Sequence, residues 1–172
     1  MWSIKKILVP TDFSKPSEAA LEAAVEVAKK FDASIVLMHA YQMPVYPYPV
    51  TAMVTPLDLV AHIEQGARKA LETAVASHAA AGVPIETSLC AGHAWEQILR
   101  AGKEFDTGLI VIGSRGLRGL PRALMGSTAE RVVRYSPVPV MTLHGPVPSG
   151  AETRTNDNGA KAAAELVDRW LI

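Results

Sequence analysis

The chain holds a single cysteine, Cys90, among its 172 residues, so it cannot form a disulfide within itself. It also lacks the apolar core of a secretory signal ahead of Asp12, and a reducing, cytoplasmic setting is therefore expected. Aromatic residues are few, at 6%, but hydrophobic residues as a whole reach 49% and charged residues 20%. This composition is typical of one compact globular domain and excludes collagen-like, coiled-coil and wholly disordered chains.

Net charge is also missing, because 17 Lys and Arg residues balance 17 Asp and Glu residues. A neutral chain has no overall field that would attract nucleic acid or an anionic membrane, so neither is expected as a partner. Residues 33–57 carry no formal charge, but four prolines interrupt them, whereas a membrane span needs about 20 mostly apolar helical residues. We expect no membrane insertion, and any anion site must be local.

Short apolar runs alternate with amphipathic segments along the first 144 residues. The apolar runs predict strands at residues 5–10, 34–40, 83–90, 109–112 and 138–143. Between them, periodic segments predict helices, the first capped by Ser14 and the second ending near Gly82. Strands that alternate with helices predict an α/β fold, a single doubly wound open sheet of five mainly parallel strands. Pro139 places the last strand at a sheet edge, because proline cannot donate to a central ladder.

Two segments fall outside this pattern. Residues 41–56 form a proline-rich connection of unusual length, which is either a functional loop or a tolerated surface insertion. Residues 145–159 are rich in Pro, Ser, Thr, Asn and Gly and predict a linker, and residues 160–172 predict a short helix or a disordered tail. We therefore expect a folded domain over residues 1–144 and an extension over residues 145–172.

A phosphate site is indicated after the fourth predicted strand. An amphipathic helix is predicted there, and three glycines precede it at fixed spacing. Two residues separate Gly113 from Gly116, nine separate Gly116 from Gly126, and Ser127 follows Gly126 directly. Glycines let the backbone approach a ligand, and the N–H groups of a helix start attract phosphate. Five arginines and one acid give residues 112–135 a local positive charge, at positions 115, 118, 122, 131 and 134 against Glu130. The alternative is that the glycines only shape a turn and the arginines form a solvated face.

Other nucleotide and metal motifs do not fit. Gly108 and Gly113 have the spacing of a P-loop, but Ser114 and Arg115 follow in place of Lys and Ser or Thr, and the glycines flank a strand. The first predicted strand is followed by Thr11, Asp12 and Phe13 with no glycine, which disfavours a dinucleotide site. The five histidines show no zinc-site spacing, and no catalytic group is identified.

The chain resembles the universal stress protein family, in particular its ATP-binding branch. The resemblance lies in the opening KKILVPTDFS, in LMHA, in the G-x2-G-x9-G-[ST] signature, and in SPVPVMTL after the next helix. It implies the strand order 3-2-1-4-5, an adenine nucleotide between the ends of strands one and four, and a homodimer through residues 138–143. Gly108 departs from the family pattern, which commonly has an acidic residue there, and the extension after His144 is not part of it.

The resemblance also implies roles for individual residues. Pro10, Thr11 and Asp12 would lie beside the adenosine, the backbone of Ala40 would bond the adenine, and Ile112 and Gly113 would approach the ribose. The phosphates would be cradled by Arg115, Gly116, Gly126, Ser127 and Thr128. Asp12 could accept from a ribose hydroxyl or the adenine amino group or hold Mg²⁺ through water, or else only stabilise the first helical turn.

The expected function is an ATP-binding, nucleotide-responsive regulatory or stress-response module, in which ATP orders the glycine loop and the connection at residues 41–56. One alternative is a slow ATPase or phosphotransferase, since Mg²⁺ and arginines stabilise phosphoryl charge. Another is a dimeric interaction protein that binds no nucleotide.

Overall fold

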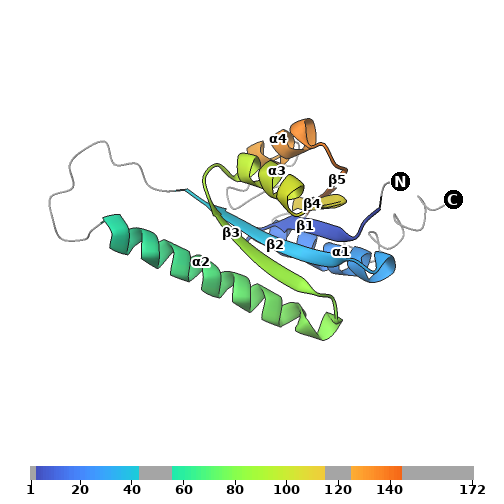
Figure 1. The fold of residues 1–172 in the computed structure, drawn as a ribbon, viewed down its shortest axis with the longest axis horizontal. Helices are drawn as coiled ribbons and strands as arrows, with labels where there is room; N and C mark the ends of the chain where they lie inside the picture. The colour runs from blue at the N-terminus through green and yellow to red at the C-terminus, as the bar shows by residue number, and fades with distance from the viewer. Residues whose placement is uncertain (1–2, 43–55, 115–124, 145–172) are drawn as a thin grey trace, which may run out of the picture.

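A computed structural model describes residues 3–42, 56–114 and 125–144, with only the backbone at 56–58 (Figure 1). The elements in chain order are β1 (Lys6–Pro10), α1 (Lys15–Phe31), β2 (Ser34–Tyr41), α2 (Pro56–His78), the 3₁₀ turn η1 (Ala79–Ala81), β3 (Ile85–Ala91), α3 (Ala94–Glu104), β4 (Leu109–Gly113), α4 (Ser127–Tyr135) and β5 (Val140–Leu143). The five strands form one sheet in the order β3-β2-β1-β4-β5, and all neighbours are parallel. The α/β class and the strand order are confirmed.

The helices cover the sheet on both faces, as a parallel sheet requires. Figure 1 shows α3 and α4 on one side of the sheet and α2 on the other. The two apolar clusters follow the same division, with α1 and α2 contributing to one and α3 and α4 to the other. This arrangement leaves the carboxyl ends of the strands along one edge of the sheet, where ligands of such folds bind.

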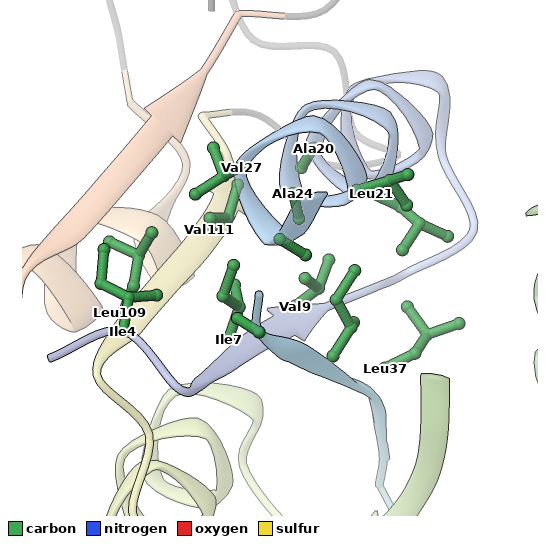
Figure 2. Close-up of a cluster of buried hydrophobic side chains, with 14 of the residues drawn as sticks. Ile4, Ile7, Val9, Ala20, Leu21, Ala24, Val27, Leu37, Leu109 and Val111 are labelled. Carbon is green, nitrogen blue, oxygen red and sulfur yellow. The ribbon is translucent and has the colours of Figure 1, made fainter. Parts of the chain in front are cut away.

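Side chains of β4 alternate between the two clusters. Leu109 and Val111 pack with α1, whereas Ile110 and Ile112 pack with α3 and α4. All four are buried, which explains why the sequence shows an unbroken apolar run there. Figure 2 shows the α1 cluster, in which α1 side chains lie over those of β1, β2 and β4.

Helix α1 begins where the sequence predicts, and the second predicted helix also ends where the sequence predicts. Ser14 occupies the N-cap position with an extended backbone, and proline stands in the first turn. The second predicted helix is α2, which ends at His78 and is followed directly by the 3₁₀ turn η1 up to Ala81. Gly82 then closes it in the left-handed region at φ 71°.

Two strand boundaries differ from the prediction by two residues, and the others by one at most. β3 begins at Ile85 rather than at Val83, and β5 begins at Val140 rather than at Val138. Before β5, the Ser136 hydroxyl donates to the Val138 carbonyl (2.7 Å) and accepts from its N–H (3.2 Å), which keeps Val138 in a turn. Pro139 enters the ladder only as an acceptor, from the Ile110 N–H at 3.0 Å, and the prediction of an edge strand is confirmed.

Parts of the sequence-based description fall outside the described residues. These are the middle of the predicted connection, at 43–55, residues 115–124 of the glycine segment, and the extension at 145–172, so the domain boundary near His144 stays a prediction. Among the residues that are described, no helix is both long and apolar enough to cross a membrane.

Candidate functional site

The ends of β1, β2 and β4 lie next to one another at the candidate site. β1 pairs with β4 through Leu8 and Ile110, and with β2 through Pro10 and Met38. Beyond the strand end, the Thr11 N–H still donates to the Met38 carbonyl at 2.8 Å. Continuing the β1–β4 register brings Pro10 beside Ile112. The structure therefore brings the predicted β1 and β4 site residues together.

The turn from β1 into α1 is held by a network of hydroxyl groups around one carboxylate. Asp12 Oδ1 accepts from the N–H of Ser14 (3.1 Å) and from its hydroxyl. Ser17 donates to the Ser14 carbonyl at 2.8 Å, so the Thr11 hydroxyl, 3.1 Å from Ser17 Oγ, is the donor in that pair. The Asp12 carboxylate thus stabilises the start of α1, as the structural alternative for this residue predicts. The Ser14 hydroxyl donates to Asp12, and the Ser14 side chain makes no capping hydrogen bond to α1.

The same turn carries an exposed aromatic residue in an unusual backbone conformation. Phe13 has φ 61°, a region that non-glycine residues seldom adopt, and the residue is 40% exposed. Its ring packs on His39, with ring centres 4.6 Å apart, and His39 Nδ1 donates to the Thr11 carbonyl at 2.8 Å. His39 therefore ties the end of β2 to the β1 turn, next to Ala40.

Gly113 allows β4 to approach the first turn of α1. A Cβ on Gly113 would lie 2.8 Å from the carbonyl oxygen of Pro16 and 3.1 Å from the nitrogen of Ser17. Both atoms belong to the backbone and cannot rotate away. Gly113 therefore has a packing role that is independent of any ligand.

Gly108 has an even closer backbone neighbour at the opposite end of β4. A Cβ there would stand 2.2 Å from the carbonyl oxygen of Ser3, while the Gly108 N–H donates to the Lys6 carbonyl at 2.9 Å. The departure of this chain from the family pattern at position 108 thus accompanies a tight contact with the N-terminal segment.

Helix α4 begins against the end of β4. The Ser114 N–H donates to the Leu143 carbonyl at 2.7 Å, and the Ser114 carbonyl accepts from the Gly126 N–H at 2.8 Å. Gly126 is the N-cap of α4 and has no side chain to cap the helix, whose first intrahelical bond runs from the Glu130 N–H to the Gly126 carbonyl at 2.9 Å. The N–H groups of Ser127, Thr128 and Ala129 therefore have no carbonyl within the helix, which is the arrangement that binds anions.

Two of the five arginines near this helix start are described, and both contact other side chains of the protein. Arg131 lies over the Trp95 ring of α3, 5.5 Å from its centre, and Arg134 pairs with Glu130 at 2.8 Å. Both guanidinium groups therefore have a partner within the protein, Trp95 of α3 for Arg131 and Glu130 of α4 for Arg134. The predicted phosphate ligands Arg115 and Gly116, with the arginines at 118 and 122, lie outside the described residues.

A second polar contact lies where β2 ends. The Tyr41 hydroxyl donates to the Glu64 carboxylate of α2, and this hydrogen bond raises the pKa of Tyr41 above its ordinary value, with burial and the Glu64 charge acting in the same direction. Next to it, Gln42 Nε2 lies 3.3 Å from His93 Nδ1 at the start of α3. These contacts connect the β2 end to the helices on either face.

The described part of the site thus combines four of the predicted groups of residues: the β1 turn, the β2 end, the β4 end and the α4 start. Sequence reasoning missed Ser17 and Ser114, whose side chains face these elements, and the role of His39. The spacing of Ser14 and Ser17 after Asp12 is a local signal that could have identified the hydroxyl network. Chemically, the start of α4 offers backbone N–H groups that can bind an anion. The ends of the strands offer the Asp12 carboxylate and backbone groups that can bind a nucleoside.

Comparison with known proteins agrees with the fold. The sequence model of the Universal stress protein family matches residues 3–144. A universal stress protein of Methanocaldococcus jannaschii is 33% identical over 144 residues, which cover 83% of each chain. Universal stress protein YxiE of Bacillus subtilis is 34% identical over 144 residues, covering 80% of this chain and 97% of the relative.

Solved structures give the same result. A protein from the universal stress protein family of Burkholderia pseudomallei superimposes with a TM-score of 0.64 at 28% identity, covering 81% of this chain and 95% of that one. A universal stress protein solved in complex with cAMP superimposes with a TM-score of 0.59 at 25% identity, covering 84% and 99%.

Proposed function

Because this chain belongs to the universal stress protein family, we propose that it binds an adenine nucleotide, ATP, between the carboxyl ends of β1 and β4. In this proposal the protein is a cytoplasmic, nucleotide-responsive module of a stress response. Bound ATP orders the glycine segment and the connection at residues 41–56, which changes the surface offered to a partner.

One observation carries the proposal. The N-terminus of α4 is held against the end of β4 by the bond from Gly126 to Ser114, with glycine in place of a capping side chain. Three backbone N–H groups and the positive end of the helix dipole are therefore available to a phosphate. The solved neighbour with bound cAMP supports the nucleotide class, since cAMP is an adenine nucleotide.

The roles of individual residues follow the placement of the elements. In the proposed complex Pro10, Thr11 and Asp12 contact the adenosine, the Ala40 backbone bonds the adenine, and Ile112 and Gly113 approach the ribose. The phosphates are held by Arg115, Gly116, Gly126, Ser127 and Thr128. Asp12, whose Oδ1 already holds the start of α1, accepts from the ribose or adenine or contacts Mg²⁺ through water.

The direct test is calorimetry with ATP, AMP and GTP on protein freed of co-purified nucleotide. We expect ATP to bind with a micromolar dissociation constant, about −8 kcal/mol, and GTP to bind more weakly. Affinity should fall as ionic strength rises, because charge–charge attraction to the phosphates is screened. A folded protein that binds no adenine nucleotide would contradict the proposal and support the interaction protein without nucleotide. Steady phosphate release above background would support the slow ATPase.

A substitution at Gly126 makes the test specific to the helix start. Gly126 has φ −63° and ψ 145°, a conformation that aspartate adopts readily at an N-cap. Gly126→Asp should preserve or raise the stability of α4, because the carboxylate caps the N–H groups, while ATP binding is abolished. Gly126→Asn is the matched control, because asparagine caps the helix without a charge. It should weaken ATP binding less than Gly126→Asp does. Unchanged ATP affinity in Gly126→Asp would place the phosphates elsewhere.

We further propose a homodimer that forms through β5. This strand stands at the edge of the sheet and all four of its residues are partly exposed. An edge strand presents backbone groups to which a second copy can pair. Sedimentation should then give a dimer mass, and a monomer at micromolar concentration would contradict the pairing.

A further inference from the structure

Ser114 presents a buried hydroxyl without a hydrogen-bond partner. The residue is 2% exposed. Among the side chains of the described residues, its Oγ is the buried polar atom that has no hydrogen-bond partner. Buried polar atoms in native proteins are nearly always hydrogen-bonded, so each exception needs a physical reason. The main chain of Ser114 is held in place on both sides, by bonds to Leu143 and to Gly126.

Ser114 lies next to the start of α4. Along β4 the side chains alternate, and the Cβ direction of Gly113 points at Pro16 of α1. Continuing the alternation puts the Ser114 side chain on the other face, with Ile112 and α4. The Ser114 carbonyl is itself 2.8 Å from the N-cap nitrogen of α4. The unpartnered hydroxyl therefore belongs to the residue against which α4 begins.

We propose that the Ser114 hydroxyl donates a hydrogen bond to a phosphoryl oxygen of the bound nucleotide, beside the N–H groups at the start of α4. This inference rests on the proposed function and adds a ligand contact that the family resemblance does not assign. A hydroxyl fits the role because phosphoryl oxygens only accept, so every group around them must donate. In the protein without nucleotide the donor has no partner, and the ligand supplies it.

The experiment compares Ser114→Ala with Thr107→Val. Thr107 lies just before β4, at its other end, and is also buried, at 4% exposure, but its hydroxyl already donates to the Gly102 carbonyl at 3.1 Å. Both variants remove one buried hydroxyl at nearly constant shape. Calorimetry measures the ATP and adenosine affinities, and urea denaturation measures the stability of the nucleotide-free protein.

Ser114→Ala should weaken ATP binding about 10- to 100-fold, as expected for a lost hydrogen bond to a charged group. Adenosine affinity should stay at the wild-type value, because adenosine has no phosphate. The urea midpoint without nucleotide should be unchanged or higher, since no protein partner is lost. Thr107→Val should behave in the opposite way, with a lower urea midpoint and wild-type ATP affinity.

Three results would overturn the inference. Wild-type ATP affinity in Ser114→Ala would show that the hydroxyl does not contact the phosphates. Equal weakening of ATP and adenosine would move the contact to the nucleoside. A lowered urea midpoint without nucleotide, with ATP affinity retained, would assign the hydroxyl to an ordered water. Failure of the proposed function itself is seen separately, in folded wild-type protein that binds no ATP.

Discussion

The close approach of β4 to α1 predicts a cost for the smallest possible substitution at Gly113. In Gly113→Ala the new methyl carbon would lie 2.8 Å from the Pro16 carbonyl oxygen, 2.9 Å from the carbonyl carbon and 3.1 Å from the Ser17 nitrogen. These distances are several tenths of an ångström shorter than ordinary contacts. The backbone of Gly113 is outside the left-handed region, so alanine meets no conformational penalty there. The entire cost comes from pushing α1 away from the sheet.

The expected magnitude follows from that displacement. Adding a methyl group to a packed interior typically costs about 1–3 kcal/mol, and here the neighbours are main-chain atoms at the first turn of a helix. Gly66 in α2 is the matched control, because a Cβ there meets nothing within 4 Å. Gly66→Ala should instead raise the free energy of unfolding by about 0.5–1 kcal/mol, since alanine is the better residue in a helix interior.

Urea denaturation followed by circular dichroism measures both variants without nucleotide. The midpoint should fall in Gly113→Ala and rise in Gly66→Ala, with the same dependence on urea in both if the unfolding stays two-state. The displaced α1 start also carries Asp12 and Ser17, so ATP affinity should fall in Gly113→Ala alone. A Gly113→Ala protein as stable as the wild type would refute the packing argument. A parallel loss in Gly66→Ala would show that the effect is not specific to the contact with Pro16.

Two further predictions concern the end of β2 and its surroundings. The pKa of Tyr41 is raised in the folded state from its ordinary value of 10.0, which we take for the unfolded state. The Tyr41–Glu64 contact therefore stabilises the fold below pH 10, and this stabilisation is lost as pH rises through the pKa of the folded state. Denaturation at alkaline pH should show this loss in the wild type and not in Tyr41→Phe; identical pH profiles would contradict it. Gly92→Ala should destabilise by about 1–3 kcal/mol in the same urea assay, because Gly92 has φ 134°, a backbone conformation that strains alanine, whereas the nearby end of the Gln97 side chain can rotate away. An unchanged midpoint would show that the loop relaxes freely.

Several features of the molecule could be predicted because they depend on near neighbours in the chain. The buried run before Gly113 predicts a strand covered on both faces, and Ser14 with the following proline predicts the start of α1. Pro139 places β5 at the sheet edge, since an absent N–H has the same consequence in any fold. The strand order itself came from the family resemblance, because alternation of strands and helices is compatible with several orders.

Long-range contacts could not be predicted in this way. The charge pattern placed Arg131 with the phosphate site, but its partner Trp95 stands on another helix, and no local signal joins the two. The Glu130–Arg134 pair, four residues apart on one helix, could have been recognised.

Residue types and their spacing along this chain were enough to predict the fold class, the N-cap of α1 at Ser14 and the end of the second helix at Gly82. Only the tertiary structure revealed that Gly113 is needed against Pro16 and that the Ser114 hydroxyl is buried without a partner. The physical reason is that local conformation depends on a few consecutive residues, whereas steric space and hydrogen-bond satisfaction depend on which distant segments meet. At this site those segments are the ends of β1 and β4 and the first turns of α1 and α4.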